Sequence, residues 1–372
     1  MLRGPIAEIS LSALLNNLKT IKSIVRDRHI IPVVKADAYG HGSIEISRLL
    51  LKHGVEYLAV AFTGEARILR ESGINCQIIV LFDRDACECI ELNLIPVIHS
   101  IEAAHEFSRE ARKRNAQINV HVKIDTGMGR LGLTGEHIMD GLLTISKMPG
   151  IKVTGIISHF SEADLKDRTF ALQQLNKFIS IRDMLSSNLN RYIFSYIANS
   201  AAVMSFPEAY LDAVRPGIML YGYSPLSYDI PADDQKFYDK LIPVMSVKTK
   251  ILNLRNVPAG TPISYGRTFT TKRKSKIGVI PLGYADGFNR LFSNNAEVLV
   301  RGRRVPVVGR VCMDMTMIDV TEIKDIKEED EVVIIGSQGQ EKITAYELAE
   351  RANTITYEIL TSLGSRARRI YV

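Results

Sequence analysis

The sequence predicts an α/β protein with an N-terminal (β/α)8 barrel of the TIM type and a C-terminal, mainly antiparallel β domain. Residues 30 to about 222 alternate short β-rich runs with amphipathic helical stretches. From about residue 243 the pattern changes to long β-branched runs that are broken by Gly and Asn. At 372 residues, of which 46% are hydrophobic, the chain is long enough to bury two separate cores.

The barrel prediction rests on a regular alternation of strand and helix signals. Stretches with helical periodicity, such as 63–73 (TGEARILRESG) and 101–115 (IEAAHEFSREARKRN), separate the β-rich runs. Eight β/α units in about 200 residues are typical of a closed parallel barrel. The expected strands are 31–37 (IPVVKAD), 56–62 (EYLAVAF), 76–82 (CQIIVLF), 95–100 (IPVIHS), 118–125 (INVHVKID), 153–160 (VTGIISHF), 192–199 (YIFSYIAN) and 214–222 (VRPGIMLYG).

The β-branched runs of the second half predict antiparallel strands. We expect the barrel to span residues 10–228 and the β domain residues 240–372, with residues 1–9 a candidate for pairing with the β domain. The segment 225–240 (PLSYDIPADDQKFYDK) is interpreted as the linker. The β-rich runs are 244–254, 276–287, 296–311, 316–321 and 331–337.

Composition argues against several classes of protein. No apolar run approaches the ~20 residues of a membrane span, and the N-terminus lacks the apolar core of a signal peptide. The four cysteines show no C-x-x-C pair, which favours reduced thiols and a cytoplasmic location. The net charge of +6 is dispersed except in TKRKSK and in the tail RARR, so neither a nucleic acid nor a membrane is the expected partner.

Polar side chains stand at the carboxyl ends of the predicted strands, which meet on one rim of a barrel. The set is rich in cations and poor in carboxylates, which argues against a metal site or glycoside hydrolysis. It suits a phosphorylated cofactor that is held by N–H groups and hydroxyls and tethered to a lysine. The residues are Lys35, Lys123, Asp125, Arg130, Ser158, His159, Asn199, Ser200, Arg215 and Gly217.

The segment GMGRLG (127–132) matches the dinucleotide-binding pattern G-x-G-x-x-G after a strand. That pattern also requires an acidic residue at the end of the next strand. Here the next strand ends in His159 and Phe160, so we reject a dinucleotide site.

Nine motifs occur in order along the chain: VVKADAYGHG (33–42), KIDTGMGRLG (123–132), SHFSEAD (158–164), ANSAA (198–202), VRPGIMLYG (214–222), ISYGRTF (263–269), GYADGFNR (283–290), VGRVCMDMTMIDV (308–320) and TITYEIL (354–360). With these motifs the chain resembles, over essentially its whole length, the alanine racemases, which depend on pyridoxal 5'-phosphate (PLP). The resemblance implies bound PLP, alanine as substrate, D-alanine for peptidoglycan, and a head-to-tail homodimer whose active sites are shared between subunits.

The resemblance assigns two catalytic residues. Lys35 matches the lysine that is linked to PLP, and Tyr265 matches a second base that reaches in from the other subunit. Two bases are expected because racemisation moves a proton at both faces of one planar carbon. His159 and Arg215 match a chain from the tyrosine to the pyridine nitrogen, where an arginine, which only donates, leaves the nitrogen unprotonated.

The remaining site residues are also implied by the resemblance. Arg130 matches the arginine near the cofactor oxygen and the substrate carboxylate, and Lys123 matches a lysine that is carbamylated in many relatives and orients it. Glu162 departs from the small or neutral residue expected in its motif. The phosphate contacts are Tyr39, Ser200, Gly217, Ile218 and Tyr357; the substrate loop contains Met313 and Asp314; the entrance contains Asp164, Tyr284, Arg290 and Arg310.

Three alternatives to a strict alanine racemase stay open. A serine racemase or one of broader specificity would use the same residues, because specificity depends on the volume around the substrate side chain. A PLP-dependent decarboxylase shares the barrel-plus-β plan, but its ring carboxylate and Gly-rich phosphate loop are not evident here. A non-catalytic PLP-binding barrel protein ends after the barrel, whereas about 150 residues follow it in this chain.

Overall fold

The computed structural model describes residues 4–226 and 240–372, which contacts between residues group into two compact units. The barrel unit contains Ala13–Ala38 and Ser43–Ile242, and the β unit contains the residues up to Ser12, Tyr39–Gly42 and Pro243–Val372. Most of the linker expected at 225–240, including the expected barrel boundary at 228, lies outside the described residues.

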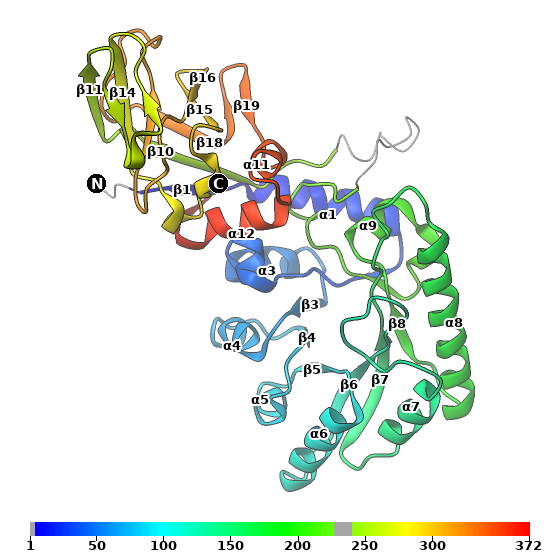
Figure 1. Ribbon diagram of the computed structural model, residues 1–372. Helices are drawn as coiled ribbons and strands as arrows, with labels where there is room; N and C mark the ends of the chain where they lie inside the picture. Colours follow the sequence, from blue (N-terminus) through cyan, green and yellow to red (C-terminus); the bar gives the residue numbers. More distant parts are fainter. Residues whose placement is uncertain (1–3, 227–239) are drawn as a thin grey trace. The chain divides into compact units, whose positions relative to one another are not determined.

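Within the described residues, eight parallel strands form the predicted barrel (Figure 1). Strands β3 to β8 pair in sequence order, and β2 pairs with β9. The Val34 N–H donates to the Ala59 carbonyl (2.9 Å) and so joins the first strand to β3. Asp212 N–H donates to the Ser195 carbonyl (3.2 Å) and joins the last strand to β8, which closes the ring. The strands are β2 (His29–Ile30), β3 (Tyr57–Val60), β4 (Gln77–Val80), β5 (Ile95–Ile98), β6 (Ile118–Lys123), β7 (Ile151–Ile157), β8 (Phe194–Tyr196) and β9 (Ala213–Val214).

Amphipathic helices cover the outside of these strands (Figure 1). Helix α6 is typical, because Ala103, Phe107 and Ala111 recur at helical spacing and are all buried. The helices of this part of the chain are α1 (Leu11–Val25), α3 (Ser43–Lys52), α4 (Thr63–Glu71), α5 (Ala86–Glu91), α6 (Ile101–Lys113), α7 (Ile138–Ser146), α8 (Thr169–Leu189) and α9 (Ser200–Ser205), with the 3-10 turn η1 (Pro207–Ala209).

The first and last barrel strands are shorter than the sequence predicts. Pro32 and Pro216 have no N–H to donate to a ladder, so regular pairing stops at Ile30 and Val214. An isolated bridge at Val33 continues the first strand, but beyond Pro216 the chain turns, with Leu220 N–H donating to the Gly217 carbonyl (2.9 Å). The prediction of a strand over 214–222 is therefore wrong beyond Pro216.

Lys35 begins a separate turn, α2 (Lys35–Tyr39), rather than ending a strand. The φ angles of Ala36, Asp37 and Ala38 are 51°, 51° and 55°, and the positive values continue through Tyr39 (54°) and Gly40 (85°). Left-handed backbone costs an L-residue roughly 1–2 kcal/mol. The surroundings of this turn must therefore hold it in place.

The β unit contains the mainly antiparallel sheets that the sequence predicts. Its largest sheet among the described residues runs β16-β15-β18-β10-β1-β20, with β19 on β18. Strand β1 pairs antiparallel with β10 and parallel with β20. A second sheet has the order β11-β14-β17. The strands are β1 (Ile6–Ile9), β10 (Met245–Lys250), β11 (Asn253–Val257), β12 (Pro262–Ile263), β13 (Phe269–Thr270), β14 (Ser275–Ile280), β15 (Glu297–Val300), β16 (Arg303–Pro306), β17 (Thr316–Asp319), β18 (Glu331–Gln338), β19 (Glu341–Ile343) and β20 (Arg368–Tyr371).

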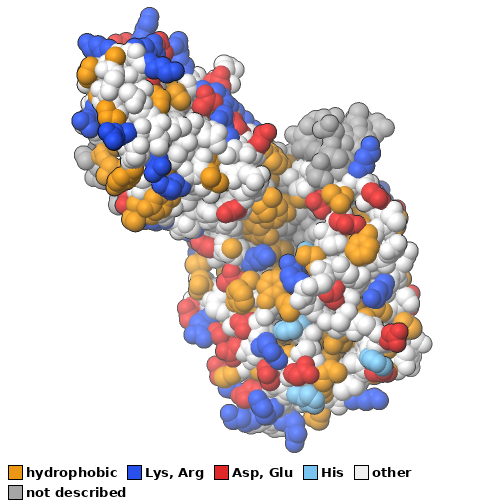
Figure 2. Space-filling model, in the orientation of Figure 1, with side chains coloured by type: hydrophobic (Ala, Val, Ile, Leu, Met, Phe, Trp, Pro, Cys, Tyr) orange, Lys and Arg blue, Asp and Glu red, His pale blue; other side chains and the backbone are white. Residues whose placement is uncertain are grey.

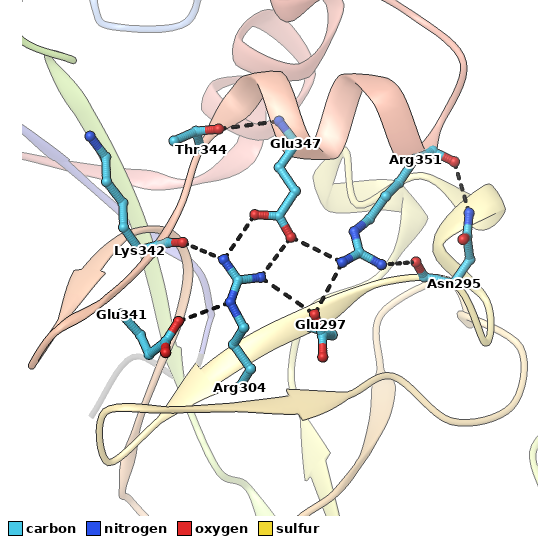
Figure 3. Close-up of polar contacts among 8 residues, drawn as sticks. All are labelled: Asn295, Glu297, Arg304, Glu341, Lys342, Thr344, Glu347 and Arg351. Carbon is cyan, nitrogen blue, oxygen red and sulfur yellow. Dashed lines mark hydrogen bonds and ion pairs between the residues drawn. The ribbon is translucent and has the colours of Figure 1, made fainter.

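A network of charged side chains ties helix α11 (Ala345–Arg351) to the large sheet (Figure 3). Arg304 on β16 contacts Glu347 on α11 at 2.7 Å and Glu341 on β19 at 3.0 Å. Arg351 contacts both Glu297 and Glu347 at 3.0 Å. The network is half-buried, so water screens it less than an ordinary surface pair. Helix α12 (Thr356–Arg366) follows α11.

Replacing Glu347 by glutamine is expected to lower the free energy of unfolding by about 1–3 kcal/mol at neutral pH, because Arg304 and Arg351 each lose one of their charged partners. The hydrogen bond from Arg304 holds the pKa of Glu347 below its ordinary value. The Glu347 carboxylate therefore stabilises the folded chain at neutral pH, and this contribution is lost as the pH falls through its folded-state pKa.

Urea unfolding of the wild type and of Glu347→Gln at about pH 7 and about pH 4 measures both effects. The difference between the two proteins should shrink at the lower pH. Glu350→Gln, an exposed position on the same helix, is the control and should unfold as the wild type does. Equal midpoints for Glu347→Gln and wild type at about pH 7 would contradict the prediction.

In residues 4–226 and 240–372, no helix has both the length and the apolar character needed to cross a bilayer. On the face of the barrel unit that Figure 2 shows, basic and acidic side chains are intermingled.

Candidate active site

Arg215 and His159 lie in contact at the rim of the barrel. The Arg215 side chain, which is buried, donates from Nη2 to the Ser158 carbonyl (2.8 Å). The same nitrogen lies 3.2 Å from His159 Nδ1. Because a guanidinium can only donate, Nδ1 of His159 accepts, and the imidazole proton is on Nε2.

His159 is held neutral by its surroundings. Burial lowers the pKa of the imidazole well below its ordinary value, and the charges of Arg215 and Lys123 lower it further. This agrees with the tautomer that the Arg215 contact requires. The imidazole can therefore donate one hydrogen bond from Nε2 without carrying a charge.

Lys35 and Arg130 lie over the same aromatic ring. The Lys35 amine is 5.4 Å from the centroid of Phe82, and the Arg130 guanidinium is 5.7 Å from it. Burial lowers the pKa of Lys35, Arg130 and Arg215 lower it further, and Glu65 raises it. A larger share of neutral, nucleophilic amine follows.

Lys123 is a buried amine in the barrel. Burial lowers its pKa well below the ordinary value, as do Arg215 and Arg130, while Asp125 opposes the shift. The lowered pKa increases the share of Lys123 that is neutral.

The loop after β6 is built around the Asp125 carboxylate. Asp125 Oδ1 accepts from the N–H groups of Gly127 and Met128 (both 2.8 Å), and Oδ2 accepts from Arg130 N–H (3.1 Å). Burial alone would raise the pKa of Asp125, but these backbone bonds hold it below its ordinary value. A Cβ at Gly132, where φ is 129°, would come within 2.7 Å of Asp125 N. The glycines of GMGRLG thus serve this loop, which carries Arg130.

Ser200 and Gly217 lie together, with Ile218 adjacent in the chain. The Ser200 hydroxyl, at the start of α9, accepts from Gly217 N–H at 2.8 Å and from Met219 N–H at 3.4 Å. Its own proton is left to donate to another acceptor. The hydroxyl and the two N–H groups thus lie together at the start of α9.

Three positions that sequence reasoning missed support the barrel residues. Gln174, in the middle of α8, donates to the His159 carbonyl (3.2 Å) and accepts from Ser161 N–H (3.1 Å). The Tyr196 ring lies 5.6 Å from the Arg215 guanidinium, and its hydroxyl is 2.7 Å from His121 Nδ1. Gln174 and Tyr196 carried no sequence signal, whereas Phe82 stands at a strand end, as the predicted residues do.

In the β unit, Tyr39 and Tyr357 lie side by side. Their ring centroids are 5.9 Å apart and their planes are tilted by 47°. Backbone atoms of Gly40 and Gly364 approach so closely that a Cβ at Gly364 would come within 2.4 Å of the Gly40 carbonyl oxygen. The segment that carries Tyr39 is thereby packed against α12.

Tyr265 opens the short turn η2 (Tyr265–Arg267) and is 69% exposed. It lines a cavity of about 570 Å³ together with Met313 and Asp314. Ser264, at φ 64°, donates from its hydroxyl to the Arg310 carbonyl (2.6 Å), which ties this turn to the loop before Met313. The predicted second base and substrate loop therefore share one surface of the β unit.

The predicted entrance residues fall into separate places. Tyr284, in η3 (Tyr284–Asp286), donates from its N–H to the Cys312 carbonyl (3.0 Å), next to Met313. Asp314 contacts Arg366 at 3.0 Å. Arg290 lies in η4 (Arg290–Phe292) of the β unit, and Asp164 lies in the barrel unit on the loop after β7, as does Glu162.

The chain thus combines a closed barrel, which carries a lysine of lowered pKa near arginines, with a separate β unit. Residues 9–225 match the family model of the alanine racemase N-terminal domain, and residues 244–371 match that of the alanine racemase C-terminal domain. The chain belongs to the alanine racemase family, whose members are isomerases.

Individual relatives cover the whole chain. The alanine racemase of Thermodesulfovibrio yellowstonii is 49% identical over 370 residues, which are 98% of this chain and 97% of that protein. The structure of the Clostridium difficile 630 enzyme has a TM-score of 0.92 and 37% identity, and covers 100% of this chain and 96% of that one. The Bartonella henselae alanine racemase, described with covalently bound pyridoxal phosphate, has a TM-score of 0.87 and 30% identity, with 99% of each chain covered.

Proposed function

We propose that this enzyme interconverts L-alanine and D-alanine by a two-base mechanism, with Lys35 at one face of the substrate carbon and Tyr265 of the partner subunit at the other. The observation that carries the proposal is the half-buried amine of Lys35, which lies over the Phe82 ring near Arg130. Burial, Arg130 and Arg215 together lower its pKa. A base fixed on one side can remove a proton from that side only, so inversion requires a second donor on the opposite side.

The residues of the barrel rim fit PLP. When bound, PLP supplies an electron sink for the carbanion that remains after the substrate loses its proton. Lys35 would be the covalent tether. In the barrel unit, the Ser200 hydroxyl and the backbone at Gly217 and Ile218 would hold the phosphate. The resemblance also assigns phosphate contacts to the hydroxyls of Tyr39 and Tyr357, whose rings lie together in the β unit.

Arg215 and His159 would link the two bases electrostatically. Arg215 only donates, so it leaves a ring nitrogen in front of it unprotonated. Because Nδ1 of His159 accepts from Arg215, its Nε2–H can donate to the phenolate of Tyr265 of the partner subunit. This bond would stabilise the anion of a phenol whose ordinary pKa is about 10.

Arg130 would bind the substrate carboxylate, and Lys123 would orient Arg130. The resemblance implies that Lys123 is carbamylated. A neutral amine is the form that adds CO2, with release of one proton, and the low pKa of Lys123 supports that form. The product would be an anion among the cations Arg130 and Arg215.

The β unit supports a homodimer with shared sites. Tyr265 and Met313 are 69% and 54% exposed and line one cavity, which is costly for apolar groups unless another surface covers them. A second copy of this chain is the proposed cover, with Met313 and Asp314 near the substrate carboxylate. We further propose that the enzyme works in the cytoplasm and supplies D-alanine for peptidoglycan.

Purified protein with added PLP, incubated with L-alanine, L-serine or L-lysine and analysed by chiral chromatography, tests the proposal. D-alanine should form fastest, and borohydride should fix the cofactor on the peptide that contains Lys35. Fastest turnover of serine would favour the broader racemase. Label on another lysine, or no D-amino acid from any substrate, would refute the assignment.

A further inference from the structure

The left-handed turn after Lys35 needs external support. Ala36, Asp37, Ala38 and Tyr39 all have positive φ angles between 51° and 55°. Residues other than glycine adopt a run of such backbone angles only where the surroundings impose it. Since the turn begins at the residue that carries the amine, whatever holds the turn also sets the direction of the Lys35 side chain.

The Glu65 carboxylate holds the first peptide of this turn. Its Oε1 accepts from Ala36 N–H at 2.6 Å. Its Oε2 accepts from Ala61 N–H at 2.6 Å and from Phe62 N–H at 3.2 Å, at the junction of β3 and α4. A single carboxylate thus joins the turn to the end of the neighbouring barrel strand.

Other bonds close the turn further along but do not reach its first peptide. Ala38 N–H donates to the Val34 carbonyl (2.9 Å), and Ser43 N–H donates to Asp37 Oδ1 (2.7 Å). The peptide between Lys35 and Ala36 is the one whose plane fixes the ψ angle of Lys35. Glu65 is the side chain that binds this peptide.

We propose that Glu65 is a positioning residue for the Lys35 amine, which it aims by clamping the Ala36 N–H to the end of β3. The proposal rests on the function proposed for Lys35. Glu65 also acts through its charge, because it raises the pKa of Lys35 against burial, Arg130 and Arg215, and so limits the loss of the protonated form.

The geometry separates these two effects in substitutions. Glutamine keeps the length of the side chain but offers one oxygen and one NH2 group. Its oxygen can accept from the N–H of either Ala36 or Ala61. The NH2 group then faces the other of these two N–H groups, and two donors cannot bond to each other. Aspartate keeps the charge but is shorter by one methylene, so it cannot span both partners. Glu71→Gln removes the same charge from an exposed position at the end of the same helix.

The first readout is hydrogen–deuterium exchange of the full-length protein, with and without added PLP, followed on peptides that contain Ala36. Exchange at Ala36 should be at least about tenfold faster in Glu65→Gln, where only a neutral amide oxygen is left to accept, and in Glu65→Asp, whose shorter side chain does not reach Ala36 from the end of β3. Glu71→Gln should exchange as the wild type does. This readout does not depend on racemisation.

The second readout is kcat for racemisation and its pH profile. Both Glu65 variants should lose at least about tenfold in kcat, since a displaced base loses its alignment. Only Glu65→Gln should shift the pH profile of kcat to lower pH, because it alone removes the charge that raises the pKa of Lys35. Thermal unfolding monitors the fold, and Glu65→Asp decides the question if Glu65→Gln does not fold.

Unchanged exchange at Ala36 in a folded Glu65 variant would overturn the proposal, and so would a loss of kcat that appears in Glu65→Gln but not in Glu65→Asp. The second result would mean that only the charge matters. Failure of the function proposed for Lys35 is recognised separately, since borohydride labelling of the wild type would then miss Lys35 while the exchange result stands.

Discussion

Replacing Lys35 by alanine is expected to lower kcat for alanine racemisation by at least about 10⁴-fold. The substitution removes one of the two proton-transfer groups and also the proposed tether. Racemisation of L-alanine by purified protein with saturating PLP measures the effect. The fold should survive, because the Lys35 amine is at the rim over Phe82 rather than inside a packed core.

Lys152→Ala is a suitable control, because this lysine is exposed on β7 of the same barrel unit. Its activity should equal that of the wild type. If Lys35→Ala keeps more than about a hundredth of wild-type kcat, Lys35 is not the base at either face of the substrate.

Replacing Tyr265 by phenylalanine is expected to lower kcat by about 10²–10⁴-fold, the usual loss for a positioned acid or base. The ring stays, so the exposed turn at Tyr265 and its cavity should be preserved. Tyr346→Phe, a half-exposed tyrosine on α11 of the same β unit, is the matched control and should keep its activity.

Mixing the two inactive proteins tests whether the site is shared. Lys35→Ala and Tyr265→Phe subunits would be exchanged by mild denaturation and refolding with PLP. A heterodimer then contains one site made from an intact Lys35 and an intact Tyr265 of the partner subunit, and one doubly defective site. A statistical mixture is half heterodimer, so activity should recover to about a quarter of wild type.

Heterodimers that are verified by mass and remain as inactive as their parents would contradict this arrangement. Tyr265 would then act within its own chain or have no part in the reaction. An equal mixture of Tyr346→Phe and Lys35→Ala should keep about half of wild-type activity whether or not subunits exchange, so it measures the activity lost during denaturation and refolding.

The sequence allowed the barrel residues to be predicted because parallel strands end on a common rim. The alternation of β-rich and helical segments identifies the strands, and at or just after the ends of three of them stand Lys123, His159 and Arg215. Their contacts, such as Arg215 with His159, then follow from the closed geometry. The resemblance supplied the residues of the β unit, where no comparable geometric rule exists.

The supporting residues could not be predicted, for a physical reason. Glu65 and Gln174 act through bonds between a side chain and a distant backbone group, and such bonds depend on how loops are folded rather than on periodicity. The left-handed turn after Lys35 was also hidden, since Ala36 and Ala38 are strong formers of right-handed helix. Pro216 did carry a signal, because a proline argues against a continued central strand.

The assignment of Tyr39–Gly42 to the β unit has a consequence for how such a protein can evolve. The chain passes between its two units after residues 12, 38, 42 and 242, so the unit boundary is not a single point in the gene. A recombination event that exchanged only the second half would bring a new helix α12 to an old Gly40, where a Cβ at Gly364 would come within 2.4 Å of the Gly40 carbonyl oxygen. N- and C-terminal halves from two lineages would therefore combine only if both keep these glycines. The turn that begins at Lys35 and helix α12, more than three hundred residues further along the chain, must then be inherited together.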